Sequence, residues 1–127
     1  MRRFACLLLL LVAACTASPP GPPHKVVVFF QEWSAAIDPA AASAIGAAAQ
    51  WAKDHPDAAI KVTGYADPTG SAAANDYMSR TRAQVVADQL VTDGVDRDRI
   101  VLGAQGATDF TLTSQESRRV EIAIGGP

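Results

Sequence analysis

Apolar residues recur along this chain either at every second position, as in strands, or with the spacing of helices. The order in which these two patterns follow one another most limits the folds that the chain can adopt. Residues 26–30 are a run of β-branched and aromatic residues, and Ile60 and Val62 alternate with Lys61 and Thr63, as in strands with one face in a core. Segments with helical spacing follow each of these strands. The sequence therefore predicts strands at 26–30, 60–64, 99–102 and 120–124, with helices at 39–54 and 72–93.

The boundaries of both expected helices carry residues that helix ends prefer. Asp38 can cap the first helix and Pro39 occupies its first position, while Pro56 prevents its continuation. Gly94 is the expected C-terminal cap of the second helix. The order β-α-β-α-β-β, with strands that are apolar on one side only, predicts an α+β fold in which both helices cover one face of a mixed four-stranded sheet.

The first 14 residues have the features of an export signal. Two arginines form a short basic region, and residues 4–12 form an apolar run that is too short to span a bilayer, which takes about 20 residues. The sequence VAAC at 12–15 resembles a bacterial lipobox, in which the cysteine is lipidated and becomes the N-terminus after cleavage. Lipidation of Cys15 is therefore predicted. The alternative is an unmodified signal that is cut after Ala14 or Ala17.

A proline-rich segment separates Cys15 from the expected domain. Residues 16–23 read TASPPGPP, which favours an extended spacer and cannot build a core. The predicted organisation is a signal peptide at 1–14, a lipidated cysteine and tether at 15–24, and one folded domain at 25–127. Without the signal, nine lysines and arginines face 13 acidic residues, so the mature chain lacks the basic surface that nucleic-acid binding needs.

The second expected helix turns polar toward its start, on the side that should face the sheet. At about 100° per residue, one arc of roughly 100° contains Asn75, Ser79, Arg82, Ala83, Val86 and Leu90. The polar members lie beside the loop at 67–70, so a carboxylate, an arginine and several hydrogen-bonding groups should converge there. The residues alone favour a structural interpretation, in which Asp67 pairs with Arg82 and pins the loop.

Two motifs in this region resemble the signature of OmpA-like domains. The first is Gly64-Tyr65-Ala66-Asp67-x-x-Gly70, and the second is Asn75-x-x-Met78-Ser79-x-x-Arg82-Ala83-x-x-Val86-x-x-x-Leu90. Gly103-x-x-Gly106 resembles the later glycine turn of that family, and residues 118–122 resemble its closing strand. The similarity covers about residues 25 to 124. It is to the peptidoglycan-binding domains of outer-membrane protein A, the peptidoglycan-associated lipoprotein and flagellar stator subunits.

This resemblance implies a site that holds the peptide stem of uncrosslinked peptidoglycan non-covalently, through its diaminopimelate. Asp67 would take the ammonium group of the ligand and Arg82 its carboxylate, with further hydrogen bonds from Thr69 and Asn75. One carboxylate and one guanidinium held apart suit a zwitterion, since arginine can bind a carboxylate through two parallel hydrogen bonds. The resemblance thus implies four site residues on or next to the second expected helix.

Some positions depart from the family pattern. Ala66 stands where threonine is usual, and Ser117 stands where asparagine often precedes the two arginines. The first strand ends as Phe30-Gln31-Glu32-Trp33 rather than the common Phe-x-Phe-Asp, so the ligand contacts of that edge are not carried over. Asp67 and Arg82 match outright, which favours binding.

Other patterns in the sequence predict no chemistry. His24 and His55 lie far apart with no neighbouring cysteine, so no metal site is expected, and no motif indicates a cofactor. Ser43, Ser71 and Ser114 lack the Gly-x-Ser-x-Gly setting of a serine hydrolase. No general acid or metal-bound water is indicated for cleavage of the wall, so the chain is expected not to be an enzyme.

The predicted function is that of a lipid-anchored protein that ties a membrane to the cell wall by binding peptidoglycan. Thr16 replaces the aspartate that often signals inner-membrane retention, which favours the outer membrane with the domain facing the periplasm. Periplasmic envelope proteins are further candidate partners. The alternative is an interaction module that keeps the scaffold and recognises a protein partner, with Asp67 and Arg82 only structural.

Overall fold

The computed structural model describes residues 23–107 and 114–125 of the 127-residue chain. In chain order its elements are β1 (His24–Phe29), α1 (Pro39–Asp54), β2 (Ile60–Ala66), α2 (Ala72–Thr92), the 3-10 turn η1 (Arg97–Arg99), β3 (Ile100–Ala107), α3 (Ser114–Ser117) and β4 (Arg119–Ile124). The expected signal peptide, Cys15 and most of the tether lie outside the described residues. Within those residues, no helix is both long and apolar enough to cross a bilayer.

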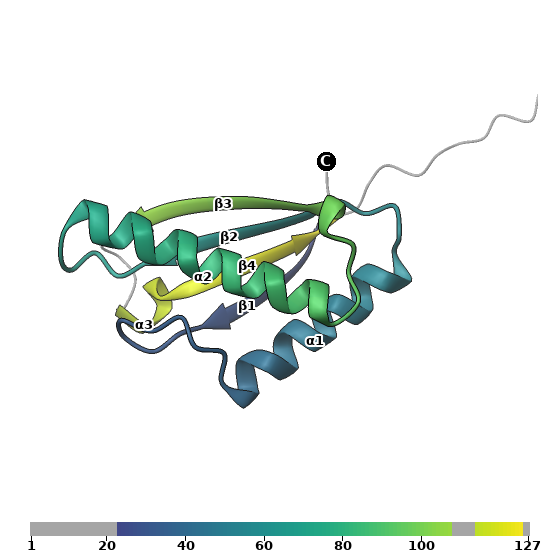
Figure 1. Cartoon of the computed structure of the whole chain (residues 1–127), viewed down its shortest axis with the longest axis horizontal. Coiled ribbons are helices and arrows are strands. Elements are labelled where there is room, and N and C mark those ends of the chain that lie inside the picture. Colours follow the sequence, from purple (N-terminus) through teal and green to yellow (C-terminus); the bar gives the residue numbers. More distant parts are fainter. Residues whose placement is uncertain (1–22, 108–113, 126–127) are drawn as a thin grey trace, which may run out of the picture.

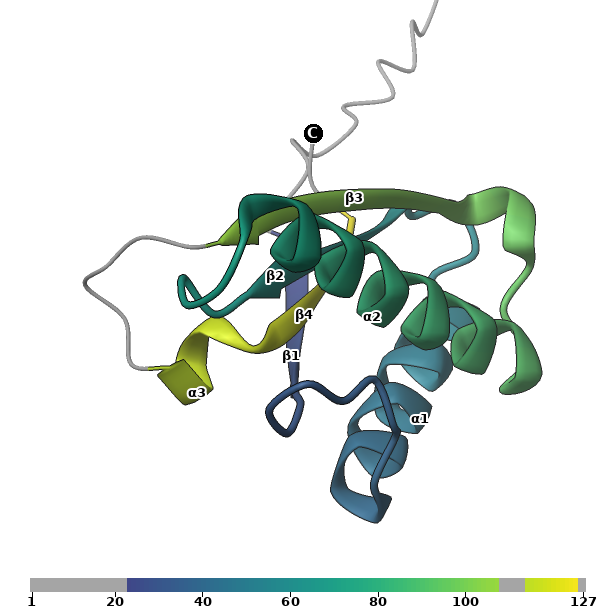
Figure 2. The ribbon, with the colours of Figure 1, turned by 60° about the vertical axis from the view of Figure 1, so that its left-hand side comes forward.

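The four strands form one mixed sheet in the order β1-β4-β2-β3, and α1 and α2 lie on the same face of it (Figures 1 and 2). β4 pairs antiparallel with both β1 and β2, whereas β2 and β3 are parallel. A parallel pair needs a long crossover connection, and α2 provides it. The architecture confirms the expected α+β fold and adds the short helix α3 before the last strand.

β3 is longer than the sequence predicts. The expected strand ends at Leu102, but β3 pairs with β2 as far as Ala107. Gly103 and Gly106 therefore lie within the strand and do not form the turn that the resemblance implied. The register shifts near this point, where Gly106 has a φ of 62°. Glycines hide the alternation of side chains on which a strand prediction depends, and this explains the error.

Both ends of α2 are capped by local hydrogen bonds. Ser71 lies directly before the helix and accepts a hydrogen bond from the amide of Ala74 at 3.1 Å. Gly94 follows the last turn with a φ of 103°, a region that glycine adopts without steric cost. The amide of Val95 donates back to the carbonyl oxygen of Leu90 at 3.0 Å, and both side chains are buried, as in a Schellman motif.

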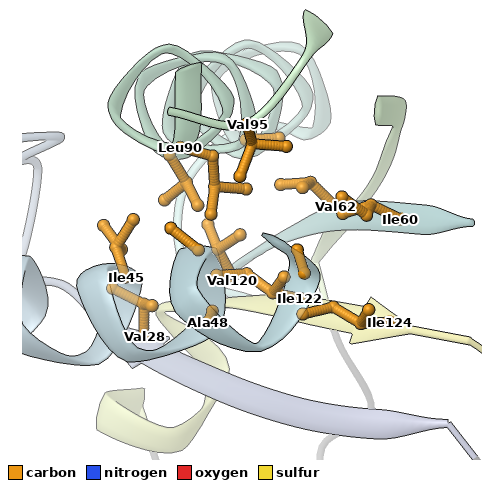
Figure 3. Close-up of a cluster of buried hydrophobic side chains, with 14 of the residues drawn as sticks. Val28, Ile45, Ala48, Ile60, Val62, Leu90, Val95, Val120, Ile122 and Ile124 are labelled. Atoms are coloured by element: carbon orange, nitrogen blue, oxygen red, sulfur yellow. The ribbon is translucent and has the colours of Figure 1, made fainter. Parts of the chain in front are cut away.

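The hydrophobic core lies between the two long helices and the sheet (Figure 3). Its central side chains are at most 1% exposed and include Val28, Ile45, Val62, Leu90, Val120 and Ile122. Gly64 lets α2 approach β2 closely, because a Cβ added to it would overlap the carbonyl oxygen of Ser79. This approach brings the polar first half of α2 against the end of β2.

The strand register gives the two ends of the sheet different surroundings. At one end, His24 of β1 and Ile60 of β2 both pair with Ile124 of β4, next to the start of the described chain. At the other end, β1 and β2 finish where β4 begins, so the loops after Phe29 and Ala66 meet the residues before β4. Strands of this length separate the two ends by about 20 Å.

Candidate functional site

A narrow pocket opens at the end of the sheet where β1 and β2 finish. The structure brings to its wall all four residues that the resemblance implied: Asp67, Thr69, Asn75 and Arg82. The wall also contains Ala66 of β2 and Met78 of α2, together with Glu32, Trp33 and Arg118 from other segments. The space open to the centre of a water molecule is about 10 Å³, which is room for a single water.

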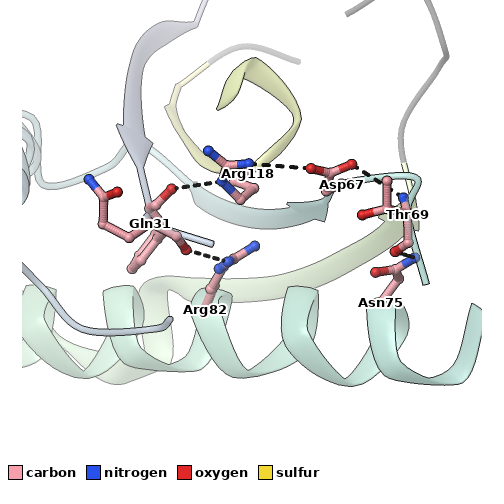
Figure 4. Close-up of polar contacts among 7 residues, drawn as sticks. Gln31, Asp67, Thr69, Asn75, Arg82 and Arg118 are labelled. Atoms are coloured by element: carbon pink, nitrogen blue, oxygen red, sulfur yellow. Dashed lines mark hydrogen bonds and ion pairs between the residues drawn. The ribbon is translucent and has the colours of Figure 1, made fainter. Parts of the chain in front are cut away.

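The loop after β2 holds Asp67 in a fixed position. The Asp67 side chain is 12% exposed, and its Oδ1 accepts a hydrogen bond from the amide of Thr69 at 3.2 Å. The Nδ2 of Asn75 donates to the carbonyl oxygen of Thr69 at 3.0 Å (Figure 4). Asn75 thus shapes the loop through the main chain of Thr69. The hydrogen bonds from both residues to a ligand stay a prediction.

Arg82 on α2 is buried, with 1% of its surface exposed. Its Nε donates to the carbonyl oxygen of Ser34 at 2.8 Å and its Nη2 to that of Gln31 at 3.0 Å. The guanidinium carbon lies 5.4 Å from the centre of the Phe30 ring, which adds a cation–π contact. Within the described residues, Nη1 donates to no acceptor, and Figure 4 shows a terminal nitrogen of Arg82 turned away from Gln31.

Three charged groups lie close together in the pocket wall. Burial and then the positive charge of Arg118 lower the pKa of Arg82 to about 10, while the negative charge of Asp67 opposes the shift. Arg82 therefore stays protonated at neutral pH. Two guanidinium groups share this part of the wall with the carboxylate of Asp67, and Glu32 adds a second carboxylate to the wall.

Arg118 is a site residue that the sequence did not predict. Its Nη1 lies 3.3 Å from Oδ2 of Asp67, and its Nε donates to the carbonyl oxygen of Phe30 at 3.2 Å. Asp67 therefore forms an ion pair with Arg118, whereas the structural interpretation expected Arg82 as its partner; Asp67 acts on Arg82 through its charge. Strand register would have indicated this contact, because an antiparallel β4 between β1 and β2 must begin where they end.

The departures from the family pattern lie in or beside this pocket. Ala66 is 1% exposed and contributes a methyl group to the wall, and Ser117 is buried at the end of α3. Trp33 is 57% exposed at the rim and has a φ of 53°. Its ring rests near Gly70, where an added Cβ would lie 3.2 Å from Cη2 of the indole. The edge after β1 thus belongs to the pocket although its residues differ from the pattern.

His24 and His55 come together away from this pocket. Both imidazole rings stack on Trp51, with ring centres 4.1 and 4.2 Å from the indole. No local pattern predicts this arrangement, since it depends on the packing of β1 beside the end of α1. The part of the chain that the structure describes contains no group of three or more side chains that could hold a metal ion.

Comparison with known proteins finds relatives in several bacteria. Probable lipoprotein YiaD of Escherichia coli is 37% identical over 97 residues, an alignment that covers 72% of this chain and 44% of the relative. Peptidoglycan-binding protein ArfA of Mycobacterium tuberculosis is 36% identical over 96 residues, with 71% and 29% covered. Outer membrane protein A of Serratia odorifera is 34% identical over 89 residues, with 58% and 37% covered. The chain thus spans less than half the length of these relatives.

Solved structures share the fold. The peptidoglycan-associated lipoprotein of Burkholderia pseudomallei matches with a TM-score of 0.70 at 23% identity, covering 78% of this chain and 89% of that one. The OmpA-like domain of FopA1 from Francisella tularensis matches with a TM-score of 0.72 at 23% identity, covering 81% and 72%. The family described as the OmpA family matches residues 29–122. OmpA-like domains are structural modules and not enzymes, and on this match the chain belongs to the OmpA family.

Proposed function

We propose that this protein binds peptidoglycan non-covalently, through the diaminopimelate of an uncrosslinked stem peptide, and that a lipid on Cys15 holds it to a membrane. The carboxylate of the ligand lies on Nη1 of Arg82 and its ammonium lies next to Asp67. Thr69 and Asn75 add hydrogen bonds. The names of two relatives support the two halves of this proposal, since ArfA is a peptidoglycan-binding protein and YiaD a probable lipoprotein.

The observation that carries the proposal is the hydrogen bonding of the buried Arg82, which uses only part of its guanidinium group. Main-chain carbonyl groups fix Nε and Nη2 of Arg82, which leaves Nη1 free of acceptors among the described residues. A guanidinium that is already held in place loses little side-chain freedom on binding, and its buried surroundings strengthen the contact. Asp67 lies in the same wall. The two ends of a zwitterion therefore find separate partners of opposite charge.

The position of the pocket suits an anchored protein. It lies at the end of the sheet opposite to His24, which is close to where the expected tether joins the domain. A lipid on Cys15 would hold the His24 end toward the membrane and leave the pocket facing away from it. We place the protein in the outer membrane, facing the periplasm, because Thr16 follows Cys15 and because outer membrane protein A is among the relatives.

Sedimentation with purified peptidoglycan tests the site. Asp67→Asn keeps the shape of the side chain without its charge, and Arg82→Lys keeps the charge without the planar guanidinium. Each variant should weaken binding by about ten- to a hundredfold, as expected when a hydrogen bond to a charged group is lost. The matched controls Asp57→Asn and Arg80→Lys change exposed residues outside the pocket and should bind like the wild type.

Thermal melting of the same variants separates binding from folding. If Asp67 and Arg82 only stabilise the domain, the melting temperature falls while the folded fraction binds peptidoglycan as before. That outcome contradicts the proposed site and favours the alternative of a module that recognises a protein partner. Release of soluble muropeptides during the assay would contradict the assignment of the chain as a binding protein without enzymatic activity.

A further inference from the structure

The turn after β1 places two side chains at the pocket that the motifs of the sequence did not assign. It spans residues 31–34 and is closed by a hydrogen bond from the amide of Ser34 to the carbonyl oxygen of Gln31 at 3.2 Å. Its central residues, Glu32 and Trp33, are exposed, and both line the pocket. The carbonyl groups at both ends of the turn accept hydrogen bonds from Arg82, and Figure 4 shows the one to Gln31. The guanidinium that faces the ligand therefore also positions the turn.

Trp33 is held in an arrangement that its own packing does not explain. Its φ of 53° lies in the left-handed region, which is disfavoured for a residue with a Cβ. The side chain is 57% exposed, so burial offsets little of this cost. The ring rests near Gly70, at the end of the loop that carries Asp67. Backbone strain at the rim of a pocket is typical of ligand clamps, and here it presents an exposed aromatic ring.

Glu32 is the second carboxylate of the pocket wall. The first, Asp67, pairs with Arg118 at 3.3 Å, and this pairing offsets its charge. Within the described residues, Glu32 makes no hydrogen bond or ion pair, and it is exposed. An ammonium group that enters the pocket therefore meets one carboxylate that is shared with an arginine and one that is not.

We propose that Glu32 and Trp33 are specificity-determining residues of the peptidoglycan site. Glu32 joins Asp67 in binding the ammonium of the zwitterionic head group whose carboxylate lies on Arg82. The indole of Trp33 moves away from Gly70 to admit the ligand and then covers its aliphatic chain, which accounts for a pocket with room for about one water. The inference rests on the proposed function and deepens it, because the site then selects a stem peptide with a free ammonium over one that is acylated there.

Calorimetric titration with two probes tests the role of Glu32. The first probe is a muramyl tripeptide with a free amine on diaminopimelate, and the second is the same molecule acetylated on that amine. Glu32→Gln should weaken binding of the free-amine probe by about two- to fivefold, the range of an exposed ion pair, and should leave binding of the acetylated probe unchanged. Asp57→Asn serves as the control, since it removes an exposed carboxylate outside the pocket.

Tryptophan fluorescence tests the role of Trp33. The chain has two tryptophans, so Trp51→Phe leaves Trp33 as the single reporter, and its emission should change when the free-amine probe binds. Trp33→Phe leaves Trp51, whose emission should not respond. Trp33→Gly relieves the left-handed backbone, so its melting temperature should not fall, although its affinity should drop several-fold. If Trp33 were only structural, Trp33→Gly would instead lower the melting temperature and leave the affinity unchanged.

The outcomes distinguish this inference from the proposed function. Wild-type binding of the free-amine probe, together with unchanged affinity in Glu32→Gln and a silent Trp33 emission, overturns the inference and leaves the proposed function standing. Failure of the folded wild type to bind the free-amine probe overturns both. Equal loss of both probes in Glu32→Gln also contradicts the inference, since the variant would then act without regard to the ammonium.

Discussion

The polar side chains around the pocket are tied to main-chain carbonyl groups. Arg82 holds the turn after β1, Arg118 holds the carbonyl of Phe30, and Asn75 holds that of Thr69. Buried polar groups that find such partners escape the cost of burial, and they also fix the loops that carry the site. Alanine variants at these positions therefore lose structure and ligand contacts together. Conservative variants give the clearer tests.

Gly64 is a position where one added methyl group should be costly. A Cβ there would overlap the carbonyl oxygen of Ser79, so Gly64→Ala must push α2 away from β2. We expect a loss of about 3 kcal/mol in the free energy of unfolding by urea. Gly46→Ala is the control, because nothing lies within 4 Å of its added Cβ and a helical alanine should gain about 0.5–1 kcal/mol. Equal stabilities of the two variants would mean that α2 and β2 separate without cost.

Tyr65 should make the domain sensitive to alkaline pH. Burial, and then the negative charge of Glu121, raise the pKa of Tyr65 above 10.0, while Arg119 opposes the shift. The unfolded chain loses this proton first, so the stabilising contribution is complete below about pH 10 and is lost as the pH rises through the folded pKa. Between about pH 8 and about pH 11, Tyr65→Phe should lose less unfolding free energy than the wild type. Identical slopes in the two proteins would refute the linkage.

Among the helices, α1 begins where its sequence specifies. Asp38 accepts a hydrogen bond from the amide of Ala41 at 2.7 Å, and Pro39 occupies the first helical position. Asp38→Ala should lower the free energy of unfolding by about 1 kcal/mol, seen as a lower melting temperature, because the first turn loses its cap. Asp38→Asn keeps an acceptor in place and should retain most of the stability. Equal melting temperatures for the two variants would show that the cap contributes nothing.

Helix boundaries were predictable because the groups that decide them are neighbours in the sequence. The caps at Asp38 and Gly94 satisfy amide or carbonyl groups within a few residues. The full length of β3 and the partner of Asp67 were not predictable in this way. Arg118 lies 51 residues from Asp67, and only the strand order brings the two together. A local sequence pattern gives no information about a contact between residues so far apart in the chain.

The candidate site shows the same difference between residues that a local sequence pattern reveals and residues that only the fold brings together. Asp67 and Arg82 stand out in the sequence because a polar stripe on a helix beside an acidic loop is a local pattern. Glu32 and Trp33 carry no such pattern, and their place at the rim follows from the way Arg82 holds their turn. The family resemblance pointed away from this edge because its residues differ. In the structure, Glu32 and Trp33 of this edge line the pocket.

At the scale of the whole molecule, the pocket and the start of the domain lie at opposite ends of the sheet. Three strands meet at His24, Ile60 and Ile124, and the pocket lies beyond their other ends, about 20 Å away. An anchor on the N-terminal side can thus act without touching the binding site. We therefore expect anchoring and binding to be separable, so that loss of one leaves the other intact.

Cys15→Ser tests this separation. The thioether to diacylglycerol cannot form without the thiol, so the variant should take up no palmitate label and should appear in the soluble periplasmic fraction. It should still sediment with peptidoglycan, because the pocket lies in a part of the chain that the substitution does not reach. Cys6→Ser is the matched control, since Cys6 lies within the expected signal peptide and its loss should change neither labelling nor fractionation. A wild-type precursor that is processed without label, and whose processing resists the lipoprotein signal peptidase inhibitor globomycin, would contradict lipidation and support cleavage of an unmodified signal after Ala14 or Ala17.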